Sequence, residues 1–305
     1  MSRLRAIVLG SAAGGGFPQW NCRCPVCQLA WDGDPRVQAR TQASLAVSRD
    51  GERWLLLNAS PDLRAQILAT PALRPGVSDG HEQVRSSPIA AVLLTGAEID
   101  QAAGLLHLRE RQPFALYATA TTLATLADNP MFEVLATDLV TRRAMKTNET
   151  VSVAGLEIAA FAVPGKVPLY LEDEGPVTAQ ESEATIGLEL SADGARMLFV
   201  PGAAAVTPAL RARMTRADVV LFDGTLFTDD EMIRSSSGNK SGLRMGHVPI
   251  DGPDGSLAAL RNLRARRIYV HINNTNPILI AGSPERRRVE AGGVEVATDG
   301  MEIVL

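Results

Sequence analysis

Three cysteines lie within six residues of this 305-residue chain, at Cys22, Cys24 and Cys27, and the sequence contains no other. Core cysteines usually follow a hydrophobic periodicity, whereas these alternate with Arg23 and Pro25 in a polar segment. A redox pair of Cys24 and Cys27 is an alternative, but it would leave the third thiol unused. Three thiolates at this spacing favour a soft cation such as Zn²⁺, with a fourth ligand, most often histidine, from elsewhere.

A second set of candidate ligands follows apolar segments that we expect to be strands. Glu98 and Asp100 follow one such segment, Asp223 ends another, and His271 ends a third, while His247 lies in a turn. Taken singly, the acids could complement a helix dipole or favour a turn, and His247 could be a surface residue. Taken together, carboxylates and imidazoles at strand ends indicate a cation site on the rim of a sheet.

The elements that must position these residues are many short strands with helices between them. A glycine-rich turn at 10–20 precedes the cysteines and can bring them to one point. The pattern indicates two sheets packed face to face with helices outside. Expected strands are 4–9, 44–47, 54–58, 89–94, 114–118, 151–161, 185–190, 196–200, 219–222, 268–271 and 293–297; expected helices are 61–69, 99–111, 121–126, 208–215, 253–262 and 283–290.

Composition excludes several classes of protein. The formal net charge is -4 and the isoelectric point is near 5.7, which opposes a nucleic-acid binder because phosphate contacts need a basic face. No apolar run reaches the roughly 18 residues of a membrane span, and no signal-peptide core follows the first residues. We therefore expect a cytoplasmic protein, in which clustered thiols stay reduced and available to a metal.

Several motifs, read together, resemble the pyrroloquinoline quinone (PQQ) biosynthesis protein B family. The similarity spans essentially the whole chain and begins with the glycine-rich turn and the Cys-x-Cys-x-x-Cys motif. Further matching segments are 58–64, 94–100, 104–110, 222–225, 245–250 and 271–279.

The resemblance implies an α/β protein with the metallo-β-lactamase fold, a four-layer αββα sandwich that forms a single domain over residues 1–305. The loop 22–27 would then be a separate structural zinc site. Hydrolytic relatives carry His-x-His-x-Asp-His after a strand, whereas this chain has Gly96, Glu98, Asp100 and Gln101 at the corresponding positions. A dinuclear zinc hydrolase is therefore the least favoured reading, since so few ligands cannot hold two ions.

The family resemblance implies a role in PQQ biosynthesis. The implied activity is an iron- and oxygen-dependent hydroxylation of the tyrosine ring in the cross-linked Glu-Tyr precursor. Glu98, Asp100, Asp223 and His247 would hold Fe²⁺ and leave positions open for dioxygen and substrate. A carrier that moves PQQ or its precursor towards the periplasm is the alternative. Gln101 stands where the resemblance implies a histidine, and this replacement weakens the site further.

The resemblance leaves the place of His271 open between the two sites. Related phosphodiesterases of this fold favour His271 as the fourth ligand of the cysteine site, since asparagine is a poor zinc ligand. We also expect hydrogen bonds to a carboxylate-rich ligand from Asn58, Ser60, Arg64, Asn273 and Asn274. Expected partners are PQQ or its precursor, other PQQ biosynthesis proteins and a second copy of this chain.

Overall fold

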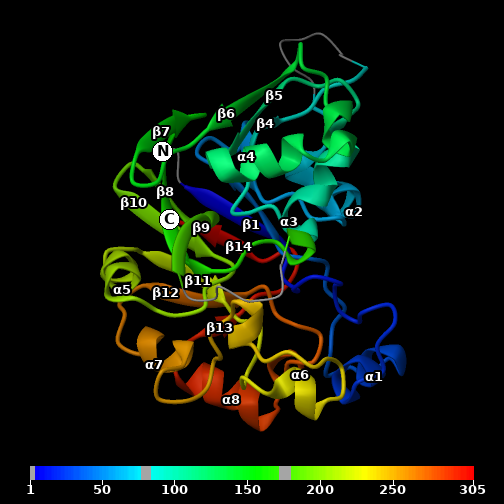
Figure 1. The fold of residues 1–305 in the computed structure, drawn as a ribbon, viewed down its shortest axis with the longest axis vertical. Helices are drawn as coiled ribbons and strands as arrows, with labels where there is room; N and C mark the ends of the chain where they lie inside the picture. Colours follow the sequence, from blue (N-terminus) through cyan, green and yellow to red (C-terminus); the bar gives the residue numbers. More distant parts are fainter. Residues whose placement is uncertain (1–3, 77–83, 172–179) are drawn as a thin grey trace.

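The computed structural model describes residues 4–76, 84–171 and 180–305, and two seven-stranded sheets form its centre (Figure 1). The strand order is β14-β1-β2-β3-β4-β5-β6 in the first sheet and β13-β12-β11-β10-β9-β8-β7 in the second. Strands β3 to β6 run parallel to one another, as do β10 to β13. The strands are β1 (Arg5–Gly10), β2 (Ser44–Ser48), β3 (Trp54–Leu57), β4 (Ile89–Leu93), β5 (Phe114–Ala118), β6 (Val140–Ala144), β7 (Thr150–Val153), β8 (Leu156–Gly165), β9 (Gln180–Ala192), β10 (Ala195–Val200), β11 (Val219–Asp223), β12 (Arg266–Val270), β13 (Glu295–Val296) and β14 (Glu302–Val304).

Helices cover the outer face of each sheet. Helices α2, α3 and α4 lie on the first sheet and α5, α7 and α8 on the second, while α1 and α6 lie beside each other at one end (Figure 1). The helices are α1 (Pro25–Trp31), α2 (Leu63–Ala69), α3 (Ile99–Ala102), α4 (Ala120–Ala127), α5 (Pro208–Thr215), α6 (Glu231–Arg234), α7 (Ser256–Leu260) and α8 (Pro284–Ala291).

Neighbouring side chains of one strand belong to different layers of the core. Leu55 and Leu57 of β3 pack between the two sheets, whereas Trp54 and Leu56 pack under the outer helices. Side chains alternate across a strand, and here both faces are covered, so these strands read as unbroken apolar runs. The four-layer αββα sandwich implied by the family resemblance is confirmed.

Two of the expected elements differ from the structure. The strand expected at 151–161 is a hairpin of β7 and β8, because Ala154 and Gly155 both adopt positive φ in a two-residue turn. The helix expected at 99–111 ends early, and residues Ala103–Leu108 form a 3₁₀ helix. Its Gly104 donates its backbone N–H to Ala59 O at 2.8 Å instead of to the preceding helical turn.

Strands β6 and β14 and helices α1 and α6 were not expected from the sequence. Strand β6 carries adjacent arginines at the edge of its sheet, and α6 has only four residues. Neither gives a strong hydrophobic period. Within the described ranges, no helix is both long and apolar enough to span a lipid bilayer.

Candidate active site

The three thiols meet at one point, as their spacing predicts. Their sulfur atoms all lie within 4.8 Å of one another. Cys24 is the N-cap of α1, and its sulfur accepts a hydrogen bond from the backbone N–H of Cys27 at 3.5 Å. Both are buried, whereas Cys22 is partly exposed. The loop therefore passes directly into a helix whose first turn supplies the third thiol.

Asn274, not His271, is the residue that reaches the thiols. Its amide nitrogen lies 3.2 Å from the sulfurs of Cys22 and Cys27 and 3.9 Å from that of Cys24. Turning the amide over presents its oxygen to the same point, and oxygen can ligate Zn²⁺. The expectation that His271 completes this site is therefore corrected, because its imidazole lies in a different cluster.

The thiols are electrostatically coupled. The hydrogen bond with Cys27, together with burial, raises the pKa of Cys24 above its usual value. The same hydrogen bond lowers the pKa of Cys27, against the effect of its burial. One proton shared between two thiols is easily displaced by a cation, since thiolates are the metal-binding form.

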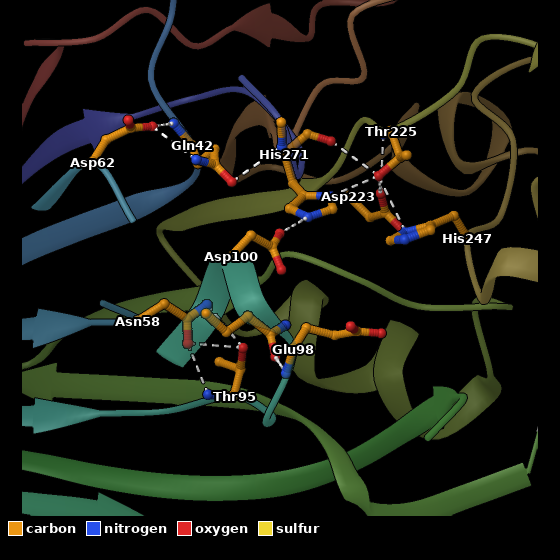
Figure 2. Close-up of polar contacts among 12 residues, drawn as sticks. Gln42, Asn58, Asp62, Thr95, Glu98, Asp100, Asp223, Thr225, His247 and His271 are labelled. Carbon is orange, nitrogen blue, oxygen red and sulfur yellow. Dashed lines mark hydrogen bonds and ion pairs between the residues drawn. The ribbon is translucent and has the colours of Figure 1, made fainter. Parts of the chain in front are cut away.

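A second cluster contains Asp223, His247 and His271, whose ligand atoms lie within 4.8 Å of one another. Asp223 Oδ2 is 2.7 Å from His247 Nδ1, and the two imidazoles stack with centroids 5.2 Å apart. Asp100 Oδ2 lies 2.9 Å from His271 Nε2 on the other side of that ring (Figure 2). Two imidazoles and two carboxylates, far apart in sequence, thus converge.

Parallel pairing of β11 with β12 explains much of this convergence. Asp223 ends β11 and pairs with Val270, the last residue of β12, so His271 leaves the sheet beside Asp223. A φ of 56° at His271 turns the chain there. His247 follows Gly246, which ends a short 3₁₀ helix. Gly246 has a φ of 84°, a backbone conformation that glycine adopts without strain.

Thr225 joins the members of this cluster and was not among the predicted site residues. Its hydroxyl oxygen lies 2.6 Å from Asp223 Oδ1, 2.8 Å from His271 Nδ1 and 3.1 Å from His247 Nδ1 (Figure 2). The hydroxyl can donate to the carboxylate and accept from a protonated imidazole. The Asp-Gly-Thr sequence after a strand was the available signal, since threonine two residues after aspartate can bond back to it.

Charges within the cluster stabilise each other. Burial raises the pKa of Asp223, but the charges of His247 and His271 and the hydrogen bonds from His247 and Thr225 together outweigh burial, so the net pKa is lowered. The pKa of Asp100 is likewise lowered by its hydrogen bond with His271, despite burial. Burial lowers the pKa of His271, but the hydrogen bond to Asp100 and the nearby carboxylate charges raise it, and the net pKa lies above its usual value. The carboxylates are therefore ionised, and a cation can replace the protons of their partners.

Glu98 and Gln101 do not join the ligand cluster. The Glu98 carboxylate pairs with Lys166 at 3.1 Å, which corrects its expected place among the iron ligands. Gln101 Oε1 accepts a hydrogen bond from the Glu98 backbone N–H at 3.3 Å and so caps α3. A Cβ at Gly96 would lie 2.6 Å from that oxygen and 3.0 Å from Ala184 O. A histidine cannot fit at position 96 without displacing both neighbours.

The cluster opens into a cavity of about 310 Å³. Among the residues proposed to bind substrate, Asn273 lines this cavity, and Asn274 lies at the thiols. The polar and charged residues that line it include Glu98, Asp100, Lys166, Lys240, His247 and His271.

The other three expected binding residues do not line the cavity, which corrects their assignment. Asn58 is buried and exchanges hydrogen bonds with Thr95, each at 2.9 Å, and Ser60 is buried against Gln66 at 3.1 Å. Arg64 is exposed on α2 and does not line the cavity. The local sequence did not show that the Asn58 and Ser60 side chains are committed to buried contacts within the protein.

The buried carboxyl group of Glu231 gives a pH-dependent test of the structure. Burial raises its pKa to about 7, although Thr275 and the Phe227 backbone donate hydrogen bonds to it. Because the folded state favours the protonated acid, this stabilisation is complete below about pH 4.5 and is lost by about pH 7, a change of about 3 kcal/mol. Urea unfolding of Glu231→Gln from pH 5 to 8 should lack this loss. A matched Glu110→Gln change, at an exposed site, should keep the wild-type slope; a wild-type slope in both would contradict the prediction.

Comparison with known proteins agrees with this architecture. A family model described as "Beta-lactamase superfamily domain" matches residues 53–272, so the fold and its ligand cluster define a beta-lactamase superfamily protein. A diphosphatase of the PhnP family has the same fold, with a TM-score of 0.68 at 19% identity over 99% of this chain and 97% of that one.

Two further relatives are far more similar. Coenzyme PQQ synthesis protein B of Methylobacterium nodulans is 56% identical over 304 residues, which are 99% of this chain and 100% of the relative. The crystal structure of Zn²⁺-bound PqqB from Methylobacterium extorquens has a TM-score of 0.95 at 54% identity and covers 99% of this chain and 100% of that one. The chain belongs to the coenzyme PQQ synthesis protein B family, which confirms the resemblance seen in its motifs.

Proposed function

We propose that this protein acts in PQQ biosynthesis as an iron- and oxygen-dependent hydroxylase of the tyrosine ring in the cross-linked Glu-Tyr precursor. The observation that carries the proposal is the cluster of Asp223, His247 and His271 at a cavity wall. Two imidazoles and one carboxylate with open positions are the ligand set of many non-haem iron(II) oxygenases. The names of the relatives support the pathway.

The donor set fits one such ion. Asp223, His247 and His271 would hold it, with Asp100 beside His271. Iron(II), when bound, supplies the one-electron chemistry that activates dioxygen. The chain's own groups position these donors. Asp100 contacts Nε2 of His271, which leaves Nδ1 of that ring to face the ion in place of its contact with the Thr225 hydroxyl. The same hydroxyl lies against Nδ1 of His247. Among the residues that the structure describes, a second ion would find too few donors beside this cluster, which opposes a dinuclear hydrolase.

The thiol cluster is proposed as a structural zinc site. Cys22, Cys24 and Cys27 supply three ligands, and Asn274 is placed to supply the fourth. Zinc in the M. extorquens structure supports this part of the proposal.

A metal-resolved oxygen assay tests the function. Protein purified without oxygen is loaded with Fe²⁺ or Zn²⁺ and then mixed with air-saturated buffer, the cross-linked diamino acid and ascorbate. Ascorbate supplies the two electrons that reduce the second oxygen atom of O₂ to water, and oxygen and product mass are followed. We expect oxygen uptake and one added oxygen atom on the ring with Fe²⁺ only. Tight binding of precursor or PQQ without uptake in the iron-loaded protein would instead support the carrier, and cleavage by the zinc-loaded protein would support a hydrolase.

Gln101→His should raise the affinity of the proposed active site for Fe²⁺. The change places an imidazole on the cavity wall. A new ligand should raise Fe²⁺ affinity by at least the roughly tenfold to hundredfold change typical of residues that only contact a ligand. Gln101→Ala is the matched control, because it loses the same hydrogen bond to Glu98 and adds no ligand. Anaerobic Fe²⁺ titration measures both. Equal affinities in the two variants would rule out position 101 as a ligand position.

A further inference from the structure

Lysine is rare in this chain, and its distribution is uneven. Lysine and arginine together number 30, yet the only lysines are Lys146, Lys166 and Lys240. Two of these three line the 310 Å³ cavity. Lys146 instead lies on the surface, with 76% of its side chain exposed. Most lysine and arginine positions of the chain are thus arginine, whereas both of those that line the cavity are lysine.

The two cavity lysines come from separate elements. Lys166 follows the last residue of β8, and its carbonyl accepts a hydrogen bond from Thr185 at 2.9 Å. Its ammonium lies 3.1 Å from the Glu98 carboxylate, and only 17% of its side chain is exposed. Lys240, partly buried, lies in the segment that leads to His247. Gly246 packs this segment against the stem of Lys166, since a Cβ there would be 3.2 Å from Lys166 Cγ.

Charge and size together identify the ligand group. The wall that contains Asp100, His247 and His271, together with the buried Asp223 that contacts His247, can take a cation. An anionic part of a ligand is therefore best held at the lysine-bearing part of the cavity. An ammonium is a compact point charge that takes a single anionic oxygen, whereas a guanidinium is a broad planar fork that fills more of a small cavity. Burial of the lysine stems strengthens such a contact relative to a surface pair.

We propose that Lys166 and Lys240 form a carboxylate-binding subsite that orients a polycarboxylate ligand relative to the metal-ligand cluster. The inference rests on the proposed function, since PQQ and its precursor are the carboxylate-rich ligands of that site. It adds the residues that determine specificity, since ligands that lack the carboxylates should bind more weakly than those that carry them.

Lysine footprinting tests the subsite directly in the wild-type protein. The protein is acetylated with a water-soluble succinimidyl ester, and each lysine is followed by peptide mass spectrometry. With PQQ at about ten times its Kd, acetylation of Lys166 and Lys240 should slow by about tenfold, while Lys146 is unaffected. PQQ trimethyl ester, and inorganic phosphate as a simple anion, should give no protection. Equal labelling of all three lysines in saturated protein, or equal protection by the ester or by phosphate, would overturn the proposal.

Substitution gives an independent measurement. Lys166→Met and Lys240→Met should each weaken PQQ binding by roughly tenfold and leave ester binding unchanged, with Lys146→Met as the matched control. Melting temperature and zinc content check that each variant is folded. Unchanged PQQ affinity, or an equal loss for the ester, would refute the subsite. A wild-type protein that binds neither PQQ nor the precursor would instead refute the proposed function, and the inference with it.

Discussion

The Cys27→Ala variant should melt roughly 10 °C below the zinc-loaded wild type, because it removes a buried ligand from the thiol site. A metal that binds only the folded state contributes about 4 kcal/mol when its free concentration is a thousand times Kd. Cys24 and Cys27 belong to the core cluster that also contains Phe17 and Phe222, so loss of the ion loosens more than one loop. Differential scanning fluorimetry with and without a zinc chelator measures the effect.

Val26→Ala is the matched control for this experiment. Val26 is buried in the same helix turn but offers no ligand, so its substitution should lower the melting temperature modestly and leave the protein sensitive to the chelator. Cys27→Ala should be insensitive, because its site is already disrupted. A wild-type melting temperature that does not change on chelation would show that the thiols hold no stabilising ion.

Asp223→Asn should lower kcat of the iron-loaded protein by roughly a thousandfold, well beyond the tenfold to hundredfold loss typical of outer-shell partners. Asp223 is fully buried, and its two oxygens accept hydrogen bonds from Thr225 at 2.6 Å and from the Ala203 backbone at 3.0 Å. An amide has one acceptor in place of two, cannot carry the charge that pairs with His247, and is a weak iron ligand.

Glu98→Gln separates a ligand role from a general charge effect. Glu98 lines the same cavity but pairs with Lys166, so its substitution should change kcat less than about tenfold and leave iron content unchanged. Iron content and oxygen uptake are measured on both variants. If Glu98→Gln loses iron while Asp223→Asn keeps it, the assignment of ligands is reversed.

Much of the architecture could be predicted from the sequence because its strands are covered on both faces. Runs such as 54–57 and 219–222 are continuously apolar, and a polar residue marks the end of each. The cysteine cluster is equally local, since Cys22, Cys24 and Cys27 need only one loop and one helical turn to meet. The proximity of Asp223, His247 and Asp100 to His271 could be expected, because polar side chains that follow the strands gather on one rim of the sheet.

What could not be predicted depends on backbone turns and distant pairings. His271 and Asn274 are three residues apart but serve different clusters, and the positive φ at His271 that separates them leaves no clear mark in the local sequence. The Glu98 carboxylate pairs with Lys166 and not with the ligand cluster. Lys166 lies 68 positions later in the sequence, so only the folded sheets bring the two side chains together. Asn58 looked available for a ligand, yet its positive φ and its bonds to Thr95 commit it to a turn.

The stretch from His271 to Asn274, which contributes to both clusters, also has a consequence for how the protein is made. A ribosome produces Cys24 some 250 residues before Asn274, and at about 5–20 residues per second this interval lasts roughly 10–50 s. For that time the nascent chain carries three thiols without their amide partner, and the late histidine is missing from its own cluster. Neither cluster is complete until residues 271–274 have been synthesised, so a metal that needs either full set of side chains can bind only after that point.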